Sequence, residues 1–173
     1  MKIASFDLAR LTGGALGESS ARPFSWTWEL GEPGSDIGLW CGALARELEE
    51  FRKAYGIPDL AVIEHWLPPR PGMVDKNVEP SLRLNGAAHA IIGGVWGCRI
   101  VEPFPATVRA AVCGRANAGE RKETKKMVLA TVKLLGLLPA NCFDDNRADA
   151  LAGWHWASSV YGRGVPGGEL VLM

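Results

Sequence analysis

The sequence lacks a hydrophobic run long enough to cross a membrane, a cysteine pattern that would bind zinc, and an excess of either charge. No stretch of roughly 18 apolar residues occurs, so we expect no transmembrane helix and no membrane partner. The chain reaches Asp7 without the apolar core of a signal peptide, which predicts a cytoplasmic location. Its 19 basic and 19 acidic side chains balance, so net charge alone does not indicate a nucleic-acid ligand.

Cysteine is scarce and widely spaced. Cys41, Cys98, Cys113 and Cys142 form no CxxC or Cys/His pattern, which argues against a zinc site. In a reducing compartment we expect these thiols to be small buried hydrophobes rather than disulfides.

Basic residues are unevenly distributed along the neutral chain. Residues 109–133 contain seven basic side chains and only two acidic ones, Glu120 and Glu123. A neutral protein can carry a local basic patch, so this segment is a candidate surface for an anionic ligand.

Hydrophobic periodicity predicts an α/β fold in one domain, residues 1–160, followed by a flexible C-terminal tail, residues 161–173. Three alternating segments with short turns predict an antiparallel meander, and the later alternation of strands and helices predicts parallel pairing. The aromatic face of the third segment suits either a buried core or a base-stacking platform. The expected strands cover residues 2–8, 24–30, 59–64 and 99–101, with a turn at 12–17 that leads into a short second strand. The expected helices cover 36–55, 81–97, 106–112, 120–135 and 145–159.

Three acidic residues stand out because of where the predicted elements place them. Asp7 lies near the end of the first strand, and Glu64 ends the apolar strand that begins at Leu60. Asp149 lies one turn into the last helix, with Asp145 four residues and Asn146 three residues before it on the same helical face. Each acid alone has an ordinary explanation as a turn or cap residue.

Together, these acids predict a metal-dependent nuclease site. Clustered carboxylates repel one another unless a cation compensates their charge. Oxygen ligands without cysteine or histidine favour Mg²⁺ or Mn²⁺. Two such ions would activate water and stabilise the leaving oxygen of a phosphodiester.

Three motifs resemble those of RuvC-type Holliday junction resolvases, most closely the phage and prophage versions: Phe6-Asp7-Leu8, Val62-Ile63-Glu64 and Ala148-Asp149-Ala150-Leu151-Ala152. The similarity covers most of residues 1–157. It includes Ser81-Leu82-Arg83-Leu84 with the small-residue helix that follows, Gly114-Arg115-Ala116 with the basic stretch after it, and Leu138-Pro139-Ala140-Asn141. The resemblance implies an RNase H-like fold whose central mixed five-stranded sheet has three antiparallel first strands and is flanked by helices. It also implies a homodimer in a bacterial or phage-infected bacterial cell, and metal-dependent paired cleavage of four-way DNA junctions.

By position, the resemblance makes Asp7, Glu64 and Asp149 catalytic metal ligands for two Mg²⁺ ions per site, with Mn²⁺ as a substitute. The family commonly has an aspartate three residues before the last acid, where this chain has Asn146. We predict Asp145 as the fourth catalytic ligand, and Asn146 as an alternative that would offer a neutral carbonyl oxygen. The first motif also has Leu8 and Ala9 where the family often has a glycine.

The basic segment and the loop after Glu64 are the expected DNA contacts. Cationic side chains would neutralise backbone phosphates, and a long loop directly after a strand-end acid is often functional. From that loop, Trp66 and Arg70 would enter the centre of the junction. We expect structural roles for His65 and His155. The predicted phosphate-binding residues are Arg115, Arg121, Lys122, Lys125 and Lys126.

Other functions remain open at this point. The same fold could act on RNA, as in ribosomal RNA maturation, and Asn146 could mark a catalytically degenerate module that only binds DNA junctions. An actin-like ATPase would need glycine-rich phosphate loops, for which Thr12-Gly13-Gly14 is the only weak candidate. For the nuclease, we expect in-line attack of water, giving 5′-phosphate and 3′-hydroxyl ends.

Overall fold

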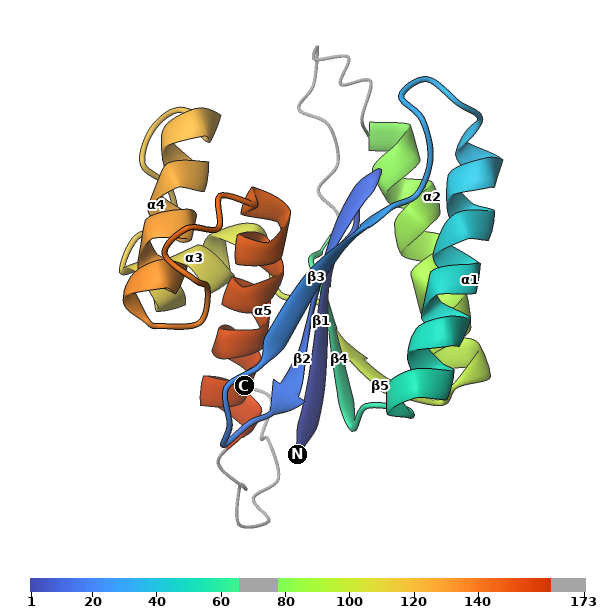
Figure 1. The fold of residues 1–173 in the computed structure, drawn as a ribbon, viewed down its shortest axis with the longest axis horizontal. Coiled ribbons are helices and arrows are strands. Elements are labelled where there is room, and N and C mark those ends of the chain that lie inside the picture. Colours follow the sequence, from blue (N-terminus) through green and yellow to red (C-terminus); the bar gives the residue numbers. More distant parts are fainter. Residues whose placement is uncertain (66–77, 163–173) are drawn as a thin grey trace, which may run out of the picture.

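Five strands form one mixed sheet in the computed structural model, which describes residues 1–65 and 78–162 (Figure 1). The strand order is β3-β2-β1-β4-β5. The first three strands are antiparallel, whereas β4 runs parallel to β1 and β5 runs parallel to β4. This arrangement confirms the predicted α/β class and the antiparallel meander. The strands are β1 (Lys2–Asp7), β2 (Leu11–Glu18), β3 (Phe24–Glu29), β4 (Leu60–Ile63) and β5 (Arg99–Val101).

Helices cover both faces of the sheet (Figure 1). One face carries α1 (Ile37–Tyr55), α2 (Val78–Ala88) and the π-helix η1 (His89–Val95). The other face carries α3 (Pro105–Cys113), α4 (Arg121–Leu134) and α5 (Asp145–Tyr161). Two hydrophobic cores result, one on each side of the sheet. Within the described residues, no helix is both long and apolar enough to span a membrane.

Helix α1 begins where its sequence predicts. The Asp36 carboxylate accepts a hydrogen bond from the Gly38 N–H at 2.6 Å, and the helix ends before Gly56, whose φ is +72°. Its buried face holds Leu44, Leu48 and Phe51.

The structure corrects the predicted helix 81–97 in its start and in its helix type. It begins earlier, at Val78, and its last part is the π-helix η1, after which the Trp96 N–H donates to the Ile91 carbonyl five residues back. Hydrophobic periodicity cannot distinguish this short π-helix from α-helix, because over only seven residues the two helix types bury nearly the same positions.

The C-terminal part of the domain is helical for slightly longer than predicted. Helix α5 extends to Tyr161, whose ring lies 5.2 Å from the Arg99 guanidinium. Residues 163–173, which make up most of the predicted tail, lie outside the described residues.

The aromatic side chains of β3 belong mainly to the core. The Trp28 ring stacks on Phe6 at 6.0 Å, and the Trp26 ring lies 5.5 Å from Phe51 of α1. Phe24, at the end of the row, is 45% exposed. The core interpretation is therefore confirmed for the two tryptophans.

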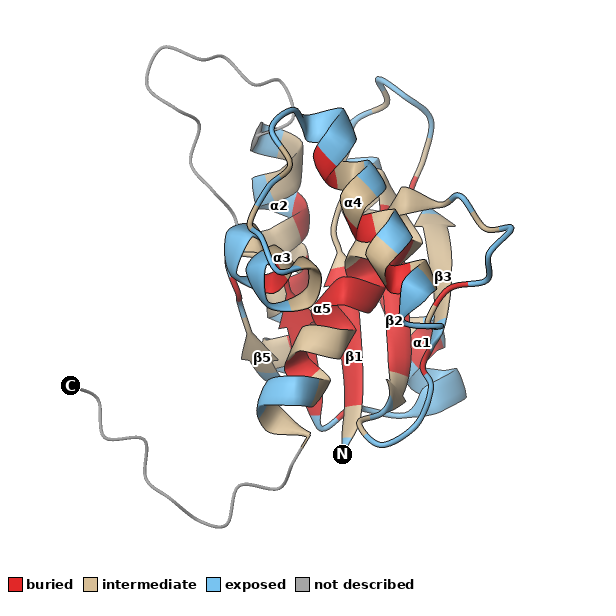
Figure 2. Cartoon of the chain, turned by 90° about the vertical axis from the view of Figure 1, so that its left-hand side faces the viewer, coloured by how far each residue is buried: buried red, intermediate tan, exposed pale blue. Residues whose placement is uncertain are grey.

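Helix α5 packs unusually close to the sheet, over the buried residues of β1 and β2 (Figure 2). A side chain at Gly13 of β2 would place its Cβ 2.0 Å from the Asn146 carbonyl oxygen. A side chain at Gly153 of α5 would lie 2.5 Å from the Ser5 hydroxyl. The glycine pair in Thr12-Gly13-Gly14 is thus part of a strand and not a phosphate loop. Gly13 allows the close approach of α5, whereas Gly14 leaves room for the Trp26 ring of β3.

This close approach predicts that Gly13→Ala lowers the free energy of unfolding by about 1–3 kcal/mol, because the new methyl group collides with backbone and α5 must move. Urea unfolding measures the effect. The matched control is Gly42→Ala inside α1, where the new Cβ meets only the Arg46 guanidinium at 3.7 Å. The control should raise stability by up to about 1 kcal/mol through helix propensity. Equal effects of the two substitutions would contradict the packing described for α5.

Candidate active site

Strand alternation brings Asp7 and Glu64 to one place. Strands β1 and β4 are parallel neighbours, and Phe6 is paired with Ile63, so the next residue of each strand emerges at the same edge of the sheet. Successive side chains of a strand point to opposite faces. Phe6 and Ile63 belong to the core beneath α1, and therefore Asp7 and Glu64 face the α5 side.

The N-terminal turn of α5 is fixed to strand β3. Asp144 caps the helix, because its Oδ1 accepts hydrogen bonds from the N–H groups of Asn146 and Arg147 at 3.0 and 3.2 Å. Its Oδ2 accepts a hydrogen bond of 2.6 Å from the Thr27 hydroxyl. The Arg147 guanidinium donates to the Ser25 hydroxyl at 3.1 Å. These contacts set the phase of the helix and hence the direction in which Asn146 and Asp149 point.

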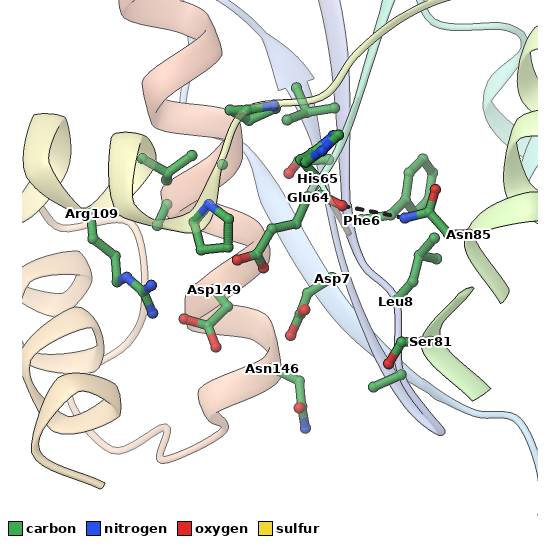
Figure 3. Close-up of a pocket in the computed structure, with 18 of the residues that line it drawn as sticks. Phe6, Asp7, Leu8, Glu64, His65, Ser81, Asn85, Arg109, Asn146 and Asp149 are labelled. Carbon is green, nitrogen blue, oxygen red and sulfur yellow. Dashed lines mark hydrogen bonds between the residues drawn. The ribbon is translucent and has the colours of Figure 1, made fainter. Parts of the chain in front are cut away.

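The three carboxylates meet in a cavity of about 390 Å³ between the sheet edge, α2, α3, α4 and α5. Figure 3 shows Asp7, Glu64 and Asp149 directed toward a common space, with Asn146 beside them. Cationic side chains share this cavity, so it combines negative and positive groups. The polar and charged lining residues are Ser5, Asp7, Glu64, His65, Ser81, Asn85, Arg109, Arg121, Lys125, Asn146 and Asp149.

Burial and mutual repulsion make the three carboxylates hard to ionise together. Burial is the main cause that raises the pKa of Asp7, Glu64 and Asp149, each to about 7. A neighbouring carboxylate raises each pKa further: Glu64 acts on Asp7, Asp149 acts on Glu64, and Asp7 acts on Asp149. The charges of Lys125 and Arg109 oppose these shifts only in part. A site of this kind is stabilised by a bound cation.

Asp145 has a different environment from the other three acids. Its carboxylate forms an ion pair with Lys125 and is not part of the cavity lining, whereas Asn146 is. Burial alone would raise the pKa of Asp145, but the hydrogen bond and charge of Lys125 outweigh it and lower the pKa. The fourth ligand stays a prediction, and the cavity lining favours the alternative, Asn146, over Asp145.

The donor set fits a hard divalent cation in chemistry and charge. Carboxylate and amide oxygens are the ligands that Mg²⁺ and Mn²⁺ prefer. As the side chains stand, no three acidic, histidine or cysteine residues within 1–65 and 78–162 are close enough to hold one ion. Ion binding would therefore require the carboxylates to draw inward, which their shared cavity permits.

The predicted phosphate-binding residues divide into two groups. Arg121 and Lys125 line the cavity, whereas Arg115, Lys122 and Lys126 are exposed on or near α4. Lys126 pairs with Glu123 of the same helix at 2.8 Å, and the Arg115 Nε donates to the Met127 sulfur at 3.1 Å. Trp66 and Arg70, the predicted junction-entering residues, lie outside the described residues. His155 is not among the cavity residues.

Arg109 of α3 is a site residue that the sequence analysis did not single out. Its guanidinium lines the cavity, and its Nε is buried without a hydrogen-bond partner among the described residues. An unpaired buried guanidinium nitrogen beside carboxylates is a ready donor for a phosphate oxygen. The available signal was Pro105 at the helix start, which places Arg109 one turn in, next to buried Val108.

Asn85 of α2 is a second residue that the sequence analysis missed. Its Nδ2 donates to the backbone carbonyl of Glu64 at 3.3 Å (Figure 3). This bond ties the strand end that carries Glu64 to the helix on the other side of the sheet. No local sequence signal marks the contact, because it joins residues 21 positions apart.

The raised pKa values predict that stability depends on pH. Free aspartate and glutamate titrate near 4, whereas the pKa of Asp7 in the folded protein is about 7. The folded state binds more protons than the unfolded state between these values, so these groups make stability fall as pH rises through this window. We expect Asp7→Asn to stabilise the metal-free protein by roughly 2–3 kcal/mol at about pH 8 and by much less at about pH 4.5, measured by urea unfolding. An equal effect at both pH values would contradict the raised pKa of Asp7.

Three solved structures share this architecture. Thermus thermophilus RuvC in complex with a Holliday junction substrate has a TM-score of 0.68 and 18% identity, over 92% of this chain and 94% of that chain. A second structure of Thermus thermophilus RuvC has a TM-score of 0.59 and 21% identity, over 92% and 95%. The yeast mitochondrial Holliday junction resolvase Ydc2 has a TM-score of 0.59 and 12% identity, over 92% and 80%. No protein-family model and no curated protein matches the sequence. The chain thus has the RNase H-like fold of RuvC-type Holliday junction resolvases.

Proposed function

We propose that the protein is a metal-dependent endonuclease that resolves four-way DNA junctions by paired strand cleavage. The observation that carries the proposal is the cavity in which Asp7, Glu64 and Asp149 meet from β1, β4 and α5. Three cationic side chains share that cavity, so it can hold both a metal ion and the phosphate to be cleaved. The fold that it shares with a RuvC solved on a junction substrate supports the choice of DNA substrate.

The residues of the cavity divide the chemistry between them. Asp7, Glu64 and Asp149 would hold Mg²⁺ or Mn²⁺, two ions per site, together with a neutral oxygen from Asn146. When bound, such ions supply a Lewis acid and lower the pKa of the attacking water. Arg109 and Arg121 would bind the non-bridging phosphate oxygens and so orient the phosphorus for in-line attack. The new bond joins the water oxygen to phosphorus as the bond to the 3′ oxygen breaks, which leaves a 5′-phosphate and a 3′-hydroxyl.

Exposed cations next to the cavity would hold the DNA strand. Arg115 lies in the loop before α4, and Lys122 and Lys126 lie on the exposed part of α4. Contacts of this kind position the phosphate backbone without reading sequence. They would also make binding salt-dependent.

Paired cleavage requires two active sites, and we propose that a homodimer supplies them. Helix α2 and η1 expose Leu82, Gly86, Ala90 and Val95 along one side. Leu82 is 48% and Val95 is 77% exposed, which leaves apolar surface for a second copy to cover. Two copies related by a two-fold axis would match the two symmetrically related strands, of the four in a junction, that paired cleavage cuts.

The direct test is Glu64→Gln, which keeps the shape of the side chain and removes its charge. We expect cleavage of a labelled four-way junction in Mg²⁺ to fall by at least about 100-fold, with junction binding retained, because the metal would lose a charged ligand. Glu50→Gln is the matched control, because Glu50 is an exposed residue of α1. This variant should cleave the junction like the wild-type protein.

The substrates in that experiment separate the alternatives. Each protein is incubated with the junction, a matched DNA duplex and an RNA duplex. Cleavage of RNA in preference to the junction would support an RNA nuclease, and tight junction binding without cleavage in Mg²⁺ or Mn²⁺ would support a degenerate binding module. Unchanged cleavage by the Glu64 variant would overturn the proposed site.

The fourth ligand has its own test. Because Asn146 lines the cavity and Asp145 is paired with Lys125, we expect Asn146→Ala to raise the Mg²⁺ concentration for half-maximal cleavage several-fold. Asp145→Asn should change this Mg²⁺ concentration much less. The reverse order would identify Asp145 as the ligand.

A further inference from the structure

Phe104 is an exposed aromatic side chain at the edge of the carboxylate cavity. Its side chain is 51% exposed. Phe104 does not itself line the cavity, but Pro103, Pro105 and His65, whose ring contacts the Phe104 ring, all do. It occupies the N-cap position of α3 and makes no side-chain capping hydrogen bond. Serine, threonine, aspartate or asparagine would stabilise a helix at this position. Helix stability therefore does not explain a large, half-exposed apolar residue at this position.

The Phe104 ring is held in a fixed position. The two prolines restrict the backbone on either side. The Phe104 carbonyl accepts hydrogen bonds from Thr107 and Val108 at 2.9 and 3.2 Å. The His65 ring meets the Phe104 ring edge-on, with centroids 4.6 Å apart and an angle of 73° between the planes. A ring fixed in this way loses little conformational freedom when a ligand stacks on it.

Two residues connect Phe104 to the candidate active site, His65 by ring contact and Arg109 through helix α3. His65 directly follows Glu64, lines the cavity, and donates its backbone N–H to the Pro103 carbonyl at 2.9 Å. Arg109 lies five residues after Phe104 on α3 and also lines the cavity. The aromatic ring is thus built into the same frame as an acid that would bind metal and a guanidinium that would bind phosphate.

The chemistry of a nucleotide matches this arrangement. A phosphate bound beside Arg109 carries a flat base a few ångströms away, and aromatic side chains stack on bases irrespective of their sequence. In a continuous duplex both faces of each base are already covered, so only an unpaired base can offer a face to Phe104. We propose that Phe104, positioned by His65, is a stacking platform for one unpaired base next to the cleaved phosphodiester.

This inference rests on the proposed nuclease function and narrows its substrate. The platform favours DNA that is opened by at least one base beside the cleavage point, as at the centre of a branched molecule. It gives the site a means of rejecting intact duplex that does not depend on reading a base sequence. The described residues contain a suitable comparison in Phe143, which is 77% exposed and lies below the Lys133 ammonium at 3.9 Å. Its sequence neighbours Cys142 and Asp144 do not line the cavity, unlike Pro103 and Pro105 beside Phe104.

The test uses a four-way junction in which 2-aminopurine, a fluorescent base, replaces the base next to the cleavage point. Stacking on an aromatic ring quenches its emission, so the wild-type protein should quench the probe in the junction and leave it unchanged in a matched duplex. Phe104→Leu keeps an apolar contact with His65 but cannot stack, and should lose the quenching and bind the junction roughly 5- to 100-fold more weakly. Phe104→Trp should retain both the quenching and the junction affinity, and Phe143→Leu should behave like the wild type.

The outcomes separate this inference from the proposed function. Wild-type quenching and affinity in Phe104→Leu would overturn the stacking platform even if cleavage is intact. If both Phe104 variants have a lower melting temperature and lose cleavage but retain quenching, the ring is a structural support of Glu64. That result would also overturn the stacking platform. If the wild-type protein binds the junction no better than duplex and cleaves neither, the proposed function itself fails.

Discussion

The repulsion between Asp7, Glu64 and Asp149 is the constraint around which this structure is built. Three partly buried acids oppose folding when they ionise together, because burial and mutual charge raise each pKa to about 7. They stay together because the packing of the rest of the chain fixes the elements that carry them. Hydrophobic cores on both faces fix the strands, and the close contact at Gly13 brings α5 onto the sheet. Folding thus holds the site in a state that a cation would relieve.

The two layers of helices contribute different parts of the site. Helix α5 supplies an acid, α3 and α4 supply Arg109, Arg121 and Lys125, and α2 on the opposite face fixes the end of β4 through Asn85. Acidic groups and cationic groups therefore reach the same cavity from separate elements. This separation allows the cations to moderate the pKa values of the carboxylates without closing the cavity through direct ion pairs. Lys125 forms its ion pair with Asp145, which does not line the cavity.

Local sequence patterns predict much of this arrangement, and long-range contacts account for the rest. The period of two in residues 2–8 and the apolar strand before Glu64 place both acids at strand ends, and the three-residue spacing puts Asn146 and Asp149 on one helical face. Which of Asp145 and Asn146 faces the cavity depends on how the helix is anchored: the Thr27 hydroxyl, 117 residues away, donates a hydrogen bond to the cap residue Asp144. The roles of Arg109, Asn85 and Phe104 likewise depend on tertiary contacts that no periodicity encodes.

The central claim is that these carboxylates form a divalent-metal centre, and anomalous diffraction from crystals soaked in Mn²⁺ tests it most directly. The account predicts anomalous density in the cavity, within coordination distance of Asp7, Glu64 and Asp149, which would have drawn together relative to their metal-free positions. It also predicts that this density disappears in Asp7→Asn crystals. Mn²⁺ bound only elsewhere, or a cavity in which the Lys125 or Arg109 side chain replaces the ion, would contradict it.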